Sequence, residues 1–123
     1  MERPEFLIGR FLSLADTLHV EYCKGVRNGD LPPQLLGNAL MPTAVSDPVK
    51  GFARMRHRLL PYQAWASTRG SALARWACGE MGKIATEIAG NLGTSRLSDA
   101  QQAQLLLGYL ARTEKTSEEG AQE

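Results

Sequence analysis

The chain has 123 residues, of which 43% are hydrophobic and 22% are charged, which is the composition of a globular domain and not of a disordered chain. This length fits one domain, whose core buries about two-thirds of the surface on folding. The formal net charge of +1 excludes a polycation of the histone kind, so any attraction to phosphate must come from local clustering. Cys23 and Cys78 form no CxxC pair, which favours reduced, buried thiols.

The first half of the chain predicts three helices. The first is long and amphipathic, begins near Pro4 and ends between Gly25 and Gly29, with an apolar stripe of Leu7, Phe11, Leu14, Leu18 and Tyr22. Residues 34–40 suit a short connecting helix, because Met41-Pro42 opposes its continuation.

Asp47 and Pro48 supply an N-cap and a first-turn proline for the third helix. Leu60-Pro61 stops or kinks this helix, and Pro61 could also start a short helix through residue 66.

The second half predicts two further helices. Ser71 can cap a helix to about residue 89, and Ser98 with Gln101 fits a capping box. The apolar stripe of the first of these helices consists of Leu73, Trp76, Ala77, Ile84 and Ile88. The second helix has Ala103, Leu106, Leu107 and Leu110 on one side.

No segment shows convincing period-two alternation, so the expected fold is all-α. Residues 1–113 are predicted to form a compact, up-and-down helical bundle of about four to five helices. Residues 114–123 form an acidic tail that we expect to be disordered. The pattern leaves open whether Ile8 and Leu12 complete the core or form a subunit interface. Because the chain has neither a signal-peptide pattern nor a run of 18 apolar residues, we expect a cytoplasmic protein without a membrane partner.

The most informative feature is a run of cations without any intervening Asp or Glu. This basic cluster consists of Lys50, Arg54, Arg56, Arg58, Arg69 and Arg75. At 100° per residue from Lys50, Arg54 lies at about 40° and Arg58 at about 80°, opposite the apolar side of the same helix. Arg56 lies at about 240°, beside the apolar arc. Such a face is either simply solvated or meets a polyanion, of which a phosphate backbone is the commonest.

Aromatic residues lie among these cations. Stacking of unpaired bases on aromatic rings is a recurrent way of binding single strands. Core packing is the better interpretation of Trp65 and Trp76, whereas the role of Tyr62 stays open. No catalytic or metal motif accompanies them, and His19 suits a solvated or hydrogen-bonded residue better than a metal ligand. We therefore expect neither an enzyme, nor a cofactor, nor a metal site.

Two short glycine-containing segments carry a resemblance to a known family. The segment from Leu7 to Asp16 (LIGRFLSLAD), read with that from Leu106 to Arg112 (LLGYLAR), is similar to the small subunit of type I CRISPR Cascade effectors. More narrowly, it resembles the helical C-terminal part of the type I-C and I-G large subunits, which is also made as a separate small subunit from an internal start. The resemblance covers about residues 6–112.

This resemblance implies a non-catalytic helical bundle that supports the displaced non-target DNA strand. Its partners would be backbone and large Cascade subunits, neighbouring copies of itself, the crRNA-bound complex and single-stranded DNA. Base pairing with the guide would supply specificity, so the protein would need sequence-independent contacts alone. The backbone-contacting residues would be Lys50, Arg54, Arg58, Arg69 and Arg75, and Arg10, Arg27 and Arg56 could instead contact protein.

One alternative of a different class stays open at this point. A helical adaptor could dock its basic face on an acidic protein surface, with nucleic acid irrelevant. Affinity for random single strands that falls with salt would separate the two hypotheses.

Overall fold

The computed structural model describes residues 3–111 and contains five helices in that range. They are α1 (Pro4–Val26), α2 (Leu36–Ser46), α3 (Pro48–Arg69), α4 (Ala72–Ile88) and α5 (Asp99–Leu110). Residues 3–111 contain no strand, so the predicted all-α helical bundle is confirmed. The acidic tail predicted over residues 114–123 lies outside the described residues.

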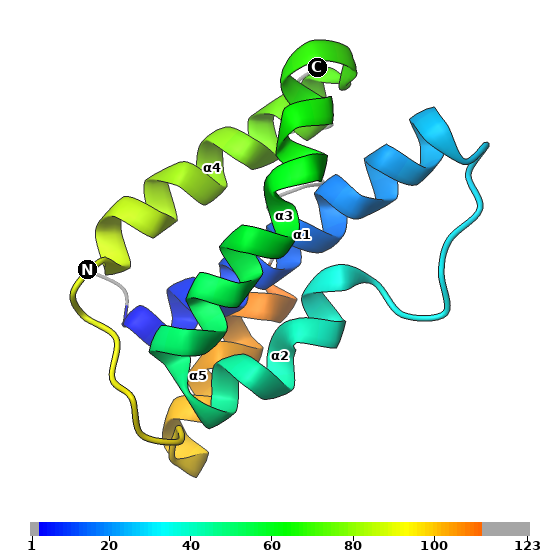
Figure 1. Cartoon of the computed structure of the whole chain (residues 1–123). Helices are drawn as coiled ribbons and strands as arrows, with labels where there is room; N and C mark the ends of the chain where they lie inside the picture. Colours follow the sequence, from blue (N-terminus) through cyan, green and yellow to red (C-terminus); the bar gives the residue numbers. More distant parts are fainter. Residues whose placement is uncertain (1–2, 112–123) are drawn as a thin grey trace.

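Helix α1 is the centre of the bundle. It packs against each of the other four helices, with α4 along one side of it and α2 on the other (Figure 1). Its residues 11–19 are all buried, which an amphipathic surface helix would not show. Ile8 and Leu12 are fully buried, so both complete the core.

Helices α1 and α5 approach so closely that glycine is required at their crossing. A Cβ atom at Gly9 would overlap the carbonyl oxygen of Leu105, and one at Gly108 would overlap the carbonyl oxygen of Phe6. Both obstacles are backbone atoms, which cannot move aside as a flexible side chain can. The two glycines therefore fix the distance between the two helices.

The buried side of α5 differs from the one that the leucine pattern suggests. Leu105 and Gly108 are buried against the bundle, whereas Leu106, Leu107 and Leu110 are 48%, 54% and 66% exposed. The close approach at Gly108 decides this orientation, because it turns the glycine side of the helix toward α1. The leucine-rich side of α5 consequently faces away from the core.

Pro42 and Pro61 lie inside helices, so the helix end predicted before Pro42 is wrong, as is the first of the two alternatives at Pro61, a stop. Helix α2 continues past Pro42 to Ser46, and α3 continues past Pro61 to Arg69. Each proline is exposed, as is the residue four positions before it, so water can replace the hydrogen bond that proline cannot make. Burial of Ala44 and Ala66 beyond the two prolines stabilises the continued helices.

The predicted starts of α3, α4 and α5 are confirmed by side-chain caps, whereas α2 begins at Leu36 without one, two residues later than predicted. Asp47 accepts a hydrogen bond from the Lys50 amide at 3.2 Å, and Ser98 with Gln101 forms the complete capping box. Between α4 and α5 the chain is tied to the α2–α3 junction, because the Leu97 amide donates to the carbonyl of Val45 at 2.9 Å. These contacts fix where α3 begins, and thereby the direction of its outer face.

Candidate nucleic-acid interface

Helix α3 presents a line of exposed cations to solvent. Lys50, Arg54, Arg58 and Arg69 are all exposed, and at 100° per residue they lie within about 100° of one another around the helix. Lys50 and Arg69 are about 28 Å apart along the axis at a rise of 1.5 Å per residue. We call these four residues the basic stripe. The structure thus brings together four of the five residues expected to contact a nucleic-acid backbone.

The basic stripe has no carboxylate partners in the described part of the chain. Within residues 3–111 the ion pairs are Lys24 with Glu21 and Lys83 with Glu80, each at 3.0 Å. Helix α3 itself contains no Asp or Glu. Within residues 3–111 the cations of this helix therefore have no ion-pair partner, and such a face attracts a polyanion.

Arg75, the fifth expected residue, lies on α4 near the end of the basic stripe. Its guanidinium Nη1 donates to the carbonyl oxygen of Gly70 at 2.5 Å, immediately after Arg69. This places the Arg75 side chain at the corner between α3 and α4, where it extends the positive surface around that corner.

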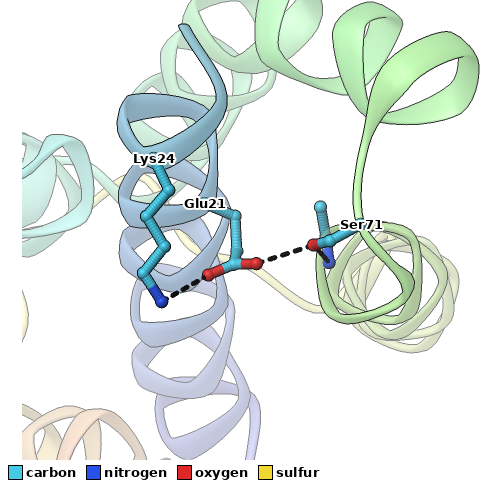
Figure 2. A network of polar contacts seen from close by, with 4 residues as sticks. Glu21, Lys24 and Ser71 are labelled. Atoms are coloured by element: carbon cyan, nitrogen blue, oxygen red, sulfur yellow. Dashed lines mark hydrogen bonds and ion pairs between the residues drawn. The ribbon is translucent and has the colours of Figure 1, made fainter. Parts of the chain in front are cut away.

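A hydrogen-bond network fastens this corner to α1. The Ser71 hydroxyl donates to Glu21 Oε1 at 2.6 Å and accepts from the Ala74 amide at 3.1 Å, while Lys24 pairs with the other Glu21 oxygen (Figure 2). Burial alone would raise the pKa of Glu21. The hydrogen bonds from Ser71 and Lys24, together with the charge of Lys24, outweigh the effect of burial, so the pKa of Glu21 is lowered. The ionised carboxylate thus holds the first turn of α4 against α1.

An aromatic groove, which the sequence did not reveal, lies beside the basic stripe between α1 and α3. It has a volume of about 640 Å³ and is lined by Tyr22, Val26, His57, Arg58, Pro61, Tyr62, Trp65 and Arg69. Trp65 is half-buried and borders this groove, so core packing describes it incompletely. The missed signal was the spacing of Arg58, Tyr62, Trp65 and Arg69 at intervals of four, three and four, which defines one side of a helix.

The three arginines expected to contact protein do not lie together on one helix. Arg56 lines a second, smaller groove of about 350 Å³ between α3 and α4, on the flank of α3 opposite the aromatic groove. Arg10 is half-buried on α1, and Arg27 is the exposed residue that follows the end of the same helix. Trp76 lies on α4, packed against the core.

Side chains of α1 hold the first turn of α2. Asp16 is fully buried; it accepts from the Gly37 amide at 2.7 Å and also from the hydroxyl of Tyr109. His19 Nδ1 accepts from the Leu36 amide at 3.0 Å. Burial lowers the pKa of His19, and the charge of Arg27 adds to this effect while that of Asp16 opposes it. His19 is thus a hydrogen-bonded structural residue, as expected.

The remaining candidates for reactive chemistry are the cysteines and the possible metal ligands. No group of three or more His, Cys, Asp or Glu side chains within residues 3–111 is arranged to hold a metal ion. Cys23 is buried and Cys78 half-buried, and both thiols are free. Burial raises the pKa of the Cys78 thiol, which disfavours the reactive thiolate.

Comparison of the chain with protein-family models, with curated proteins and with solved structures gives no match. None of the helices within residues 3–111 is long and apolar enough to span a membrane.

Proposed function

We propose that the chain is a non-catalytic small subunit of a type I CRISPR Cascade complex that supports the displaced single strand of target DNA. In this role it packs along the backbone subunits and beside other copies of itself. Its contacts with DNA are made to phosphates and are independent of sequence, since the guide RNA supplies specificity.

The observation that most supports this proposal is the basic stripe, whose cations have no ion-pair partner in the described part of the chain. Four exposed cations along about 28 Å of one helix suit a linear polyanion better than a compact ligand. The formal net charge of +1 makes binding by an isolated chain weak and salt-sensitive. Several copies arranged along one strand would multiply such weak contacts through effective concentration.

The two segments that carry the family resemblance have a common structural role, which also supports the proposal. Gly9 and Gly108 lie in these segments, and both are required where α1 crosses α5. The similarity therefore includes two residues that set the geometry of the bundle, beside exposed positions such as Leu106 and Leu107.

Reversing the charge of the basic stripe tests the DNA-binding part of the proposal. We expect Arg54→Glu combined with Arg58→Glu to reduce loading of single-stranded DNA by the assembled complex. Affinity falls with salt, and loss of two phosphate contacts should make this fall shallower. The slope of log affinity against log salt should decrease in magnitude by about 1.4, or 0.7 for each contact with a single strand. The matched control is Arg3→Glu with Arg96→Glu, which changes the net charge equally at two exposed positions outside α3.

Equal DNA loading by the stripe variant and the control variant would contradict the assignment of the basic stripe. If the stripe variant instead loses a protein partner and binds DNA unchanged, the helical adaptor that docks on an acidic protein replaces the proposal. Unaltered thermal unfolding of both variants ensures that a lost interaction reflects charge and not fold.

A further inference from the structure

The aromatic groove has cations at its ends and rings between them. Arg58, Tyr62, Trp65 and Arg69 recur at helical spacing on one side of α3 and all line the groove. At 1.5 Å per residue the two arginine positions are about 16 Å apart along α3. The volume of about 640 Å³ falls within the range typical of small-molecule sites.

The rings that line this groove are held in fixed orientations. Tyr22 packs edge-to-face against Tyr62, with ring centroids 4.9 Å apart, and against Trp65, with centroids 5.4 Å apart. An edge-to-face contact leaves ring surface uncovered on both partners, and all three side chains are half-buried. Aromatic surface is thus presented to the groove with little rotamer freedom left to lose on binding.

Gly25 allows Trp65 to lie this close to α1. A Cβ atom at Gly25 would be 2.8 Å from Cζ2 of the indole and would displace the ring. The position of the Trp65 ring against the end of α1 therefore depends on a residue without a side chain. The groove is thus bounded by Tyr22 of α1 and by Tyr62 and Trp65 of α3.

We propose that the aromatic groove binds one unpaired base of a DNA single strand by stacking, with Arg58 and Arg69 holding the phosphates on either side of that base. The inference rests on the proposed function insofar as the strand is the displaced target strand. It goes beyond that function because it adds a base contact to an interface otherwise made of phosphate contacts.

The chemistry of the groove lining favours a nucleotide over an acidic protein segment. Among residues 3–111 no carboxylate belongs to the lining, so anionic phosphates meet no repulsion from the described groove walls. An acidic peptide would pair with the arginines but would leave the ring surfaces without a matching aromatic partner. Every base has a π-face, so stacking here is independent of sequence, as a strand of arbitrary sequence requires.

Intrinsic fluorescence can locate the base, because the chain has two tryptophans. In the Trp76→Phe variant the remaining emission comes from Trp65, and we expect a single-stranded oligothymidylate to quench it. In the Trp65→Phe variant the emission comes from Trp76, which packs against the core on α4, and we expect no change. Equal responses from the two variants would overturn the assignment of the stacking site.

Binding of an abasic strand separates stacking from phosphate contact. At low ionic strength the full chain should bind an oligothymidylate about fivefold to 150-fold more tightly than an abasic strand of equal length, as expected for one stacked base. Trp65→Leu should abolish this preference, whereas Trp65→Phe retains it. Tyr62→Leu provides a second test if Trp65→Leu lowers the melting temperature.

The possible failures of this inference and of the proposed function are distinguishable. Equal affinity for intact and abasic strands would overturn the stacking inference and leave the phosphate contacts of the proposed function intact. Absence of binding to both strands would overturn the inference and also remove the single-stranded DNA contact from the proposed function.

Discussion

The crossing of α1 with α5 lacks side chains at its point of contact, whereas the outer side of α3 carries long ones. At the crossing, Gly9 and Gly108 have no side chain, and two helix backbones meet. Along α3, long cationic side chains extend from the helix without a carboxylate partner in the described part of the chain. The first region determines the fold and tolerates almost no change. The second contributes little to stability and is therefore free to serve binding.

The largest loss of stability is expected when one methyl group is added at the crossing of α1 with α5. We expect Gly108→Ala to lower the free energy of unfolding by about 3 kcal/mol, because the new Cβ would overlap the backbone of Phe6. In the control Gly79→Ala the Cβ meets no atom within 4 Å, so this helical position should gain about 0.5–1 kcal/mol. Chemical denaturation measures both, and similar effects would contradict the packing described.

A second test removes the buried carboxylate beside the crossing. Asp16→Ala leaves the Gly37 amide and the Tyr109 hydroxyl without their acceptor, so we expect a loss of about 2 kcal/mol in the free energy of unfolding. Asp16→Asn retains an acceptor oxygen and should lose less. The control is Asp30→Ala in an exposed turn; if it were as damaging as Asp16→Ala, the assigned hydrogen bonds would not be responsible.

The pH dependence of stability tests the contact of His19 with α2. Burial lowers the pKa of folded His19 below 6.5, so the unfolded state binds more protons in this range and stability rises with pH. We expect the free energy of unfolding to fall as the pH decreases through about 6.5, because protonated Nδ1 cannot accept from the Leu36 amide. His19→Gln should flatten this dependence on pH. If His57→Gln flattened it instead, the dependence would arise from His57 and the prediction for His19 would be wrong.

The smallest effect is expected on the exposed side of α5. Leu107 is 54% exposed, so Leu107→Lys should change the free energy of unfolding by no more than about 0.5 kcal/mol. Leu105 is buried, and Leu105→Ala should lower it by about 3 kcal/mol. Thermal or chemical unfolding of the two variants shows which side of α5 faces the core. A larger loss of stability from Leu107→Lys than from Leu105→Ala would contradict the orientation described for α5.

Local signals in the sequence predicted the helix starts well and the helix ends less well. Asp47, Ser71 and Ser98 each cap the helix that their side chains predict, because capping involves neighbours in the chain. The sequence pattern at Pro42 and Pro61 opposes helix continuation, yet both prolines lie inside helices on exposed sides. Whether proline ends a helix depends on the burial of residues beyond it, and this is a tertiary property.

The candidate site was predictable in its charges and not in its groove. The exposure of Lys50, Arg54 and Arg58 follows from helical periodicity within a single segment. The approach of Tyr22 to Trp65 joins residues from two helices and depends on Gly25, so no pattern within one segment reveals it. The spacing of Arg58, Tyr62, Trp65 and Arg69 was visible, but apolar rings at such spacing usually indicate core.

The most direct test of the central claim is to recover the chain from its native host with a C-terminal tag at moderate salt. Mass spectrometry would identify the proteins that co-purify, and sequencing would identify the nucleic acid. The account predicts repeat-derived guide RNA together with Cascade backbone subunits. A protein partner recovered without such RNA would contradict it and would make the basic stripe a protein-docking surface.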